Sequence, residues 1–354
     1  MARLWPRGGL LKALRIVEPG RTDLVDLPEA SPGPGEVLVG IAALGFCGSD
    51  LNSFRGRNPL VSYPRIPGHE VSGVVLEPGP GVGDSLAPGT PVFVVPYTSC
   101  GRCPSCRQRR FNTCRENQTL GVQRDGAARE RMVLPALKLL TWPGLSLRDM
   151  ALVEPLTIGF HAADRGRIAP GDTVAVFGCG VVGLGAISAA SRRGGRVIAI
   201  DVDDRKLDLA RRAGAAHALN STAGDVRDPL QELTGGDGPD VVIEAVGLKE
   251  TYRAAVEIVA FAGRVVYIGW AHEDVAYTTK PFVLKELDIL GSRNATPPDF
   301  LAVARMLAEG GFPKEALVSR AVSLVEAGPA LAAWSADPLS VTKLQVDFGL
   351  SAGS

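Results

Sequence analysis

A glycine-rich turn between two apolar strands constrains the fold more than any other feature of this chain. The apolar run Thr173–Phe177 leads into Gly-Cys-Gly-Val-Val-Gly, an apolar helical stretch follows, and a second strand ends at Asp201. In such a βαβ unit, Gly178 allows the tight turn, Gly180 lets a pyrophosphate approach the helix N-terminus, and Gly183 lets the helix pack closely on the strand. The sequence therefore predicts a Rossmann dinucleotide site at this turn.

The acidic residue at the end of the second strand indicates which dinucleotide is bound. Asp201 lies 23 residues after Gly178, where a carboxylate accepts hydrogen bonds from a ribose hydroxyl. A 2′-phosphate would face that carboxylate, so the sequence favours NAD over NADP.

The distribution of strands predicts an α/β protein with two domains, which 354 residues are enough to form. Apolar runs between Pro and Gly clusters at Glu36–Ala43, Val71–Leu76 and Thr90–Val95 indicate a β-rich, barrel-like first domain. From about Thr173, strands alternate with helical stretches, which predicts a parallel sheet. Its further strands are expected at Val197–Ile200, Asp240–Ala245, Arg264–Ile268 and Asp288–Leu290. Lys343–Phe348 alternates like a strand again and is expected to return to the first domain.

Charge and hydropathy exclude several classes of protein. Lys and Arg number 38 and so do Asp and Glu, so the chain has no overall basic field for nucleic acid or anionic lipid. Every apolar stretch is shorter than the roughly 20 residues that cross a bilayer. The N-terminus lacks the apolar run of a signal peptide, so we expect a cytoplasmic protein whose six Cys are metal ligands rather than disulfides.

Four of the six Cys form a compact candidate zinc site. Cys100, Cys103, Cys106 and Cys114 lie within fifteen residues in the pattern C-x2-C-x2-C-x7-C, enough for a closed tetrahedral site of structural type. A nucleic-acid zinc module is the alternative, because several Arg residues decorate the lobe. Such modules usually split their ligands into separated pairs, which this lobe does not.

A second, open metal site needs three protein ligands and a free position. Cys47 lies in a Gly-flanked turn, and His69 follows Gly68 at the start of a strand. Taken alone, a single Cys or His more often packs in a core than binds a metal.

The turns around Cys47 and His69, the four-Cys lobe and the Gly-rich turn occur together in the order and spacing of one known family. From about Lys12 to Phe348 the sequence resembles the zinc-dependent medium-chain dehydrogenase/reductases of the alcohol dehydrogenase superfamily, especially their sorbitol/polyol and threonine dehydrogenase branch. The resemblance implies a GroES-like catalytic domain at 1–158 and 295–354, with a structural-zinc lobe at about 97–117. It also implies a doubly wound Rossmann NAD-binding domain at 159–294.

The resemblance assigns ligands to the open site. Cys47 and His69 match two ligands of a catalytic zinc, and Glu154 occupies the third position, where two-Cys alcohol dehydrogenases carry Cys. Glu70 matches an acid that approaches the zinc directly or through water. Which of Glu70 and Glu154 binds zinc directly in each state is therefore left open.

The resemblance also implies a route for the substrate proton. Ser49 matches the hydroxyl that takes this proton, and Asp50 matches the carboxylate that orients His69. Asn52 replaces the His that relays the proton onward in many relatives, and an amide cannot titrate near pH 7, so we expect water to take that place.

Cofactor and substrate residues complete the expected site. The expected cofactor residues are Gly178, Gly180, Val181, Gly183 and Asp201. The resemblance adds Val182 behind the nicotinamide ring, Lys206 near the adenosine ribose and Lys343 as a cation for the pyrophosphate. The substrate candidates are Asn52, Arg55, Asn58 and Arg293, with Arg57 and Tyr63 in the loop before His69.

Together these residues predict an enzyme that oxidises a secondary alcohol to a ketone by hydride transfer to NAD, with two zinc ions per chain. The segment Glu154–His161 resembles the sorbitol dehydrogenase branch, which favours a polyol, sugar or sugar acid; threonine and simple alcohols are the alternatives. A zinc-free reductase or a non-catalytic NAD-sensing protein would lack Cys47, His69 or Ser49, and this chain has all three. Because relatives are dimers or tetramers, a homo-oligomer is expected.

Overall fold

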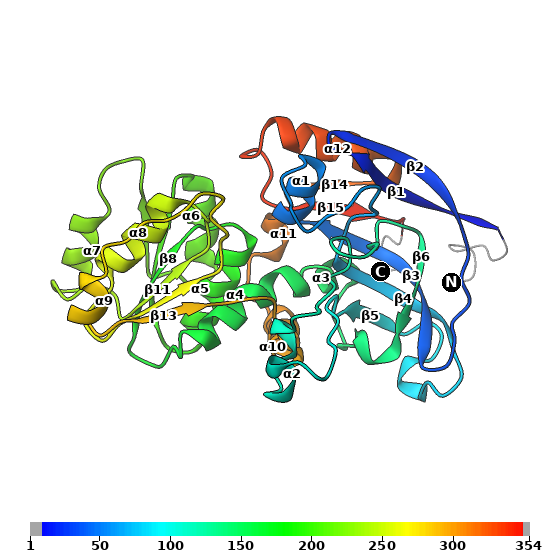
Figure 1. Ribbon diagram of the computed structural model, residues 1–354, viewed down its shortest axis with the longest axis horizontal. Coiled ribbons are helices and arrows are strands. Elements are labelled where there is room, and N and C mark those ends of the chain that lie inside the picture. Colours follow the sequence, from blue (N-terminus) through cyan, green and yellow to red (C-terminus); the bar gives the residue numbers. More distant parts are fainter. Residues whose placement is uncertain (1–8, 350–354) are drawn as a thin grey trace. The chain divides into compact units, whose positions relative to one another are not determined.

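The computed structural model describes residues 9–349, and their contacts divide the chain into two units (Figure 1). The first unit runs to Glu154 and resumes at Leu317, and the second spans Pro155–Ala316. The boundary expected at residue 158 lies in the same helix, α4 (Val153–Arg165), as the observed division. The boundary expected at 295 differs, because the structure assigns residues 295–316 to the second unit.

Side-chain contacts of helix α10 (Pro297–Glu309) explain the second boundary. Met306 Sδ lies 3.0 Å from Ser188 Oγ on helix α5 (Val181–Arg192), and Asp299 Oδ2 lies 3.1 Å from His161 Nδ1 on α4. The helix therefore packs on the second unit, although its sequence position suggested a return to the first.

A parallel sheet forms the centre of the second unit, as the strand and helix alternation predicted. Its order is β10-β9-β8-β11-β12-β13. The chain therefore adds β9 and β10 on one side of β8, and then adds β11, β12 and β13 on the other side. The loop after β8 lies at this switch point, at the carboxyl ends of the strands, where ligands bind in open α/β sheets. The strands are β8 (Thr173–Phe177), β9 (Arg196–Asp201), β10 (His217–Asn220), β11 (Val241–Glu244), β12 (Arg264–Tyr267) and β13 (Asp288–Gly291).

Strands β8 and β11 are buried along their whole length, and helices α5, α6 (Asp204–Arg212) and α8 (Lys249–Ile258) pack on this sheet (Figure 1). Besides these and α4 and α10, the helices of this part of the chain are α7 (Arg227–Leu233), α9 (Lys280–Leu284) and α11 (Lys314–Leu317), which ends at the boundary between the units. No helix within residues 9–349 is long and apolar enough to cross a membrane.

The first unit is β-rich, with sheet order β14-β15-β3-β4-β5-β7 and with β6 also paired to β3. Nearly every residue of β3 is buried, which makes this strand the centre of the core. A separate antiparallel hairpin, β1–β2, was not predicted from the sequence. The strands are β1 (Leu10–Glu18), β2 (Arg21–Pro28), β3 (Glu36–Phe46), β4 (Glu70–Pro78), β5 (Pro91–Val94), β6 (Arg131–Pro135), β7 (Leu139–Leu140), β14 (Arg320–Val322) and β15 (Leu344–Asp347).

The C-terminal segment returns to the N-terminal strands of this unit. Strand β15 pairs antiparallel with β3, with Leu344 opposite Phe46, so the residue before β15 lies beside the end of β3. Helix α12 contacts β1 and α1, as the red and blue segments in Figure 1 show. The helices of this unit are α1 (Gly48–Phe54), α2 (Pro104–Arg107), α3 (Leu147–Met150) and α12 (Leu324–Ala336).

Candidate active site

Cys47 is fixed between the end of β3 and the start of α1, where it caps the helix. Its sulfur accepts a hydrogen bond from Ser49 N at 3.2 Å, and its own N–H donates to Asp50 Oδ2 at 3.0 Å. Ser49 Oγ also lies 2.9 Å from the sulfur. This reciprocal cap fixes the thiol and the Ser49 hydroxyl side by side.

His69 faces the same sulfur. Its Nε2 lies 3.2 Å from Cys47 Sγ, and its ring is buried. Asp50 Oδ2 lies 3.9 Å from Nδ1, too far for a hydrogen bond, while Asp50 Oδ1 accepts one from Gly68 N at 3.0 Å. Burial by itself lowers the pKa of His69, but the facing Cys47 and Asp50 groups outweigh it and hold that pKa well above its usual value.

Glu154 reaches this site from the first turn of α4. It is buried, and one of its carboxylate oxygens lies within 4.8 Å of donor atoms of His69 and Glu70. The hydroxyl of Tyr97, itself buried, donates a hydrogen bond to Glu154 Oε1. Burial raises the pKa of Glu154 to about 7. Tyr97 was not predicted from the sequence, because a single Tyr between β5 and the four-Cys lobe carries no distinguishing pattern.

Glu70 makes a different contact, with Lys343. The ammonium Nζ lies 2.6 Å from both carboxylate oxygens of Glu70 and donates to Phe46 O at 3.2 Å. A Cβ at Gly45 would lie 1.8 Å from Glu70 Oε2, so glycine leaves the space that this carboxylate occupies. The family resemblance suggested Lys343 as a ligand of the cofactor pyrophosphate, whereas the structure engages its ammonium in this buried ion pair.

The donor atoms of the site fit a zinc ion. Cys47, Asp50 and His69 form one group with donor atoms within 4.8 Å of one another, and His69, Glu70 and Glu154 form another. Tetrahedral bonds of about 2.3 Å to sulfur and about 2.0 Å to nitrogen would place those two atoms roughly 3.5 Å apart, close to the observed 3.2 Å. A thiolate, an imidazole and a carboxylate are all ligands that zinc accepts.

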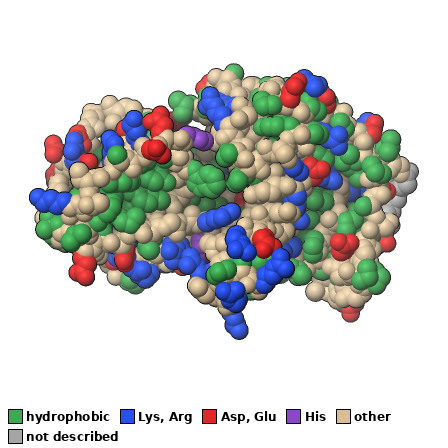
Figure 2. Space-filling model, in the orientation of Figure 1, with side chains coloured by type: hydrophobic (Ala, Val, Ile, Leu, Met, Phe, Trp, Pro, Cys, Tyr) green, Lys and Arg blue, Asp and Glu red, His purple; other side chains and the backbone are tan. Residues whose placement is uncertain are grey.

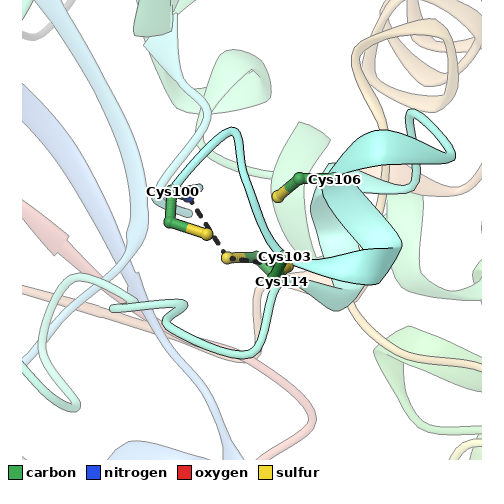
Figure 3. Close-up of side chains that lie close together, drawn as sticks. All are labelled: Cys100, Cys103, Cys106 and Cys114. Atoms are coloured by element: carbon green, nitrogen blue, oxygen red, sulfur yellow. Dashed lines mark hydrogen bonds between the residues drawn. The ribbon is translucent and has the colours of Figure 1, made fainter.

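The four-Cys lobe also fits a zinc ion. Figure 3 shows the four side chains converging from a loop and from α2, and their sulfurs all lie within 4.8 Å of one another. Cys103 Sγ and Cys114 Sγ are 3.9 Å apart, while a tetrahedral site with bonds of about 2.3 Å needs about 3.8 Å. A hydrogen bond with the Ser105 hydroxyl lowers the pKa of the Cys103 thiol, whereas burial raises the pKa of the Cys106 thiol to about 12.

Basic side chains cover the outside of this lobe. Lys and Arg side chains gather around α2 in Figure 2, and the exposed ones are Arg102, Arg107, Arg109, Arg110 and Arg115. Glu116 pairs with two of them, Arg102 and Arg115.

The Gly-rich turn of the second unit has the geometry that a dinucleotide needs. Gly178 has φ +89°, and a Cβ at Gly183 would lie 1.7 Å from Gly178 O. At the start of α5, a Cβ on Gly180 would meet nothing within 4 Å beyond the adjoining backbone, so a pyrophosphate can approach there. Val181 and Val182 follow in the first turn of α5, and Lys206 lies on α6.

Asp201 joins this turn to the end of β9. Its Oδ2 accepts a hydrogen bond from Cys179 N at 2.6 Å, and its Oδ1 accepts from Val202 N and Asp203 N at 2.8 and 3.0 Å. Asp201, which we expect to bind the cofactor ribose, therefore also holds the Gly-rich turn, which we expect to bind the pyrophosphate.

Most substrate candidates make contacts within their own unit. Arg55 donates to Ser335, Asn58 Nδ2 donates to Ser53 Oγ at 3.2 Å, and the Tyr63 hydroxyl donates to Ser53 O. Asn52 is half-buried on α1, Arg57 is exposed after it, and Arg293 is exposed after β13 in the second unit. Their contact with a substrate stays a prediction.

Comparisons with known proteins decide the family. A model described as "Alcohol dehydrogenase GroES-like domain" matches residues 33–144, and one described as "Zinc-binding dehydrogenase" matches residues 181–309. The L-galactonate-5-dehydrogenase of Escherichia coli K12 is 35% identical over 79% of this chain and 82% of its own length. The chain belongs to the zinc-dependent medium-chain dehydrogenases. A sorbitol dehydrogenase from Halalkalibacterium halodurans, 30% identical over 87% of this chain and 90% of its own, places it beside the polyol branch of that family.

Solved structures agree with this chain in fold. One described as a short chain alcohol dehydrogenase (rspB) from Escherichia coli CFT073, complexed with NADH, is 29% identical with a TM-score of 0.89, covering 96% of this chain and 100% of that one. A zinc-binding dehydrogenase from Sinorhizobium meliloti, bound to NADP, is 32% identical with a TM-score of 0.88 and the same coverage. This medium-chain dehydrogenase is thus a zinc-type alcohol dehydrogenase that uses a nicotinamide cofactor, and the predicted family and fold are confirmed.

Proposed function

We propose that this enzyme oxidises a secondary hydroxyl of a polyol, sugar or sugar acid to a ketone, with NAD as the hydride acceptor. The observation that carries the proposal is the pairing of Cys47 with His69 beside the Ser49 hydroxyl. The buried Glu154 belongs to a second group of donor atoms, with His69 and Glu70. Relatives named for L-galactonate and sorbitol support the substrate class.

The chain's own residues bind the metal and move the proton in this proposal. When bound, the zinc supplies a Lewis acid that lowers the pKa of a hydroxyl, and the nicotinamide supplies the hydride acceptor. Ser49 Oγ, held 2.9 Å from Cys47 Sγ, accepts the hydroxyl proton. Asn52 follows on the same helix and cannot carry that proton onward, so water takes it.

Glu154 is the proposed third zinc ligand rather than Glu70. Both oxygens of Glu70 lie 2.6 Å from the Lys343 ammonium, so a move to the metal would break a buried ion pair. Glu154 has a neutral phenol as its hydrogen-bond donor, and no cation must be displaced from it at that contact. The four-Cys lobe holds the second zinc of each chain in a closed site.

The preference for NAD is proposed from Asp201. Its carboxylate lies at the end of β9 and contacts the backbone of the Gly-rich turn, so a 2′-phosphate would meet a negative charge.

A cytoplasmic homo-oligomer is proposed as the working form. Hydrophobic side chains gather on the face of the second unit that carries α8, α9 and β13 (Figure 2), and the exposed ones include Phe261, Val283, Leu284 and Ile289. Apolar residues beside the unpaired edge of a sheet suit a second copy of the chain. Light scattering on the purified protein tests this, and a monomer at micromolar concentration would contradict it.

The decisive experiment measures reduction of NAD and of NADP across polyols, aldonates, threonine and simple alcohols. We expect turnover with NAD and at least one polyol or aldonate, and little turnover with NADP. Turnover only with threonine or a simple alcohol would contradict the proposed substrate class, and a preference for NADP would contradict the interpretation of Asp201.

A further inference from the structure

Glu244 is a carboxylate buried at the carboxyl end of β11 that no proposed function has used. Its side chain is 0% exposed. Its Oε1 accepts three hydrogen bonds, from Val246 N at 2.9 Å, Gly247 N at 2.8 Å and Thr251 Oγ1 at 2.7 Å. One oxygen therefore fixes the loop after β11 and the first turn of α8.

The second carboxylate oxygen has no such role. Glu244 Oε2 is buried and has no hydrogen-bond partner among residues 9–349. A Cβ at Gly269 would lie 2.8 Å from it, so the loop after β12 closes over this oxygen. The backbone carbonyl of Glu244 also accepts from Ile268 N at 2.9 Å, which joins the same two loops.

The loop that Glu244 fixes lies against the Gly-rich turn. A Cβ at Gly178 would be 2.9 Å from Val246 Cγ2 and 3.2 Å from Ala245 O. Strands β8 and β11 pair with Phe177 opposite Glu244, and Ala245 N donates to Phe177 O at 2.9 Å. Val246, which lies beside the turn, also donates its own N–H to Glu244 Oε1.

We propose that Glu244 is a positioning residue for the dinucleotide: its Oε1 holds the Ala245–Leu248 loop so that Val246 supports the Gly178 turn in its binding conformation. The inference rests on the dinucleotide site proposed at that turn. Glu244 acts through hydrogen-bond acceptance and not through charge, because all three donors share one oxygen and the other oxygen has none. An uncharged amide oxygen at the same position still presents an acceptor to these donors.

The test measures dissociation constants for NADH and NADPH by cofactor fluorescence in wild type and variants, without any turnover. Glu244→Gln should bind the preferred cofactor within about twofold of wild type, because the amide oxygen replaces Oε1. Glu244→Leu should weaken binding on the order of tenfold, or about 1.4 kcal/mol, because Val246 loses its anchor. Thr251→Val removes one of the three donors and should have a smaller effect in the same direction.

Asp240→Leu is the matched control for Glu244→Leu, since the Asp240 carboxylate accepts a hydrogen bond at the other end of β11. Its Oδ2 accepts from Thr173 N at 2.7 Å, at the amino end of the sheet and away from the turn. This variant should lose thermal stability but keep the wild-type dissociation constant.

The outcomes separate this inference from the proposed site itself. Glu244→Leu that folds and binds cofactor as wild type does would overturn the inference, and so would Glu244→Gln that binds as weakly as Glu244→Leu. If Glu244→Leu does not fold, Glu244→Gln and Thr251→Val still decide it. Gly178→Ala tests the dinucleotide site itself. Unchanged cofactor affinity of Gly178→Ala would contradict that site. Weaker cofactor binding by Gly178→Ala, together with wild-type binding by the Glu244 variants, would overturn only the positioning role.

Discussion

Lys343 and Glu70 form a buried ion pair, with Nζ 2.6 Å from both carboxylate oxygens and side-chain exposures of 2% and 0%. The pair joins the start of β15, near the C-terminus, to the start of β4 beside His69. Two buried opposite charges neutralise each other, and removal of one partner leaves the other without compensation. Lys343 therefore neutralises a buried carboxylate that follows His69 directly in the chain.

Lys343→Met should destabilise the enzyme by roughly 3 to 5 kcal/mol, because Glu70 would stay buried without its cation. Urea unfolding of the purified protein measures this. The double variant Lys343→Met with Glu70→Gln should recover much of the loss, since no charge is then left unpaired. Equal unfolding midpoints for wild type and Lys343→Met would contradict the prediction.

Tyr97→Phe should weaken zinc binding at the open site about tenfold, because hydrogen bonds to a metal ligand orient it and their loss typically costs roughly 10- to 100-fold in metal affinity. Chelator competition measures the affinity, and a cobalt-substituted sample reports ligand geometry by its absorption spectrum. Tyr63→Phe is the matched control: its hydroxyl also bonds inside the first unit, to Ser53 O, and zinc affinity should not change. If both variants bind zinc like wild type, Tyr97 does not position Glu154.

Zinc affinity of the open site should fall as pH is lowered through about 7. Burial raises the pKa of Glu154 to about 7, so below that pH a proton competes with the metal for the carboxylate. Each competing proton weakens binding about tenfold per pH unit below its pKa. Glu154→Gln should reduce the slope of log affinity against pH between about 6 and 7, because the amide takes up no competing proton. The same slope in wild type and variant would mean that Glu154 is not a ligand.

Loss of one Cys should lower thermal stability at the four-Cys site but abolish turnover without loss of the fold at the open site. Cys103→Ser opens a closed four-thiolate site whose binding free energy contributes to folding, so thermal stability should fall together with zinc content. Cys47→Ser should remove the other zinc and abolish turnover while the circular dichroism spectrum stays unchanged, because the core does not depend on an open site. Metal analysis with thermal melts distinguishes the two, and full activity of zinc-depleted Cys47→Ser would contradict the assignment.

Local patterns in the sequence were enough to predict the family, the two-domain fold and the parallel sheet. The spacing of Cys100, Cys103, Cys106 and Cys114 brings four candidate metal ligands together within one short segment, and β8 occupies the predicted Thr173–Phe177. Such features depend on residues close in the chain, where spacing and periodicity fix geometry directly. The hairpin β1–β2 was missed, because its residues are only partly buried on β2 and give a weak alternation.

Contacts between residues distant in the chain were decided only by the tertiary structure. The Lys343–Glu70 pair spans 273 residues and Tyr97–Glu154 spans 57, so no spacing rule could join them. The polar residues of the loop before His69 stay predicted substrate contacts, and the tertiary structure adds hydrogen bonds from Asn58 and Tyr63 to Ser53 and from Arg55 to Ser335. The sequence determines which chemical groups are present and which local turns they form. Tertiary packing determines which buried groups contact each other. Burial of a charge or hydroxyl without a hydrogen-bond partner costs free energy, so each buried group pairs with a residue that the fold brings next to it.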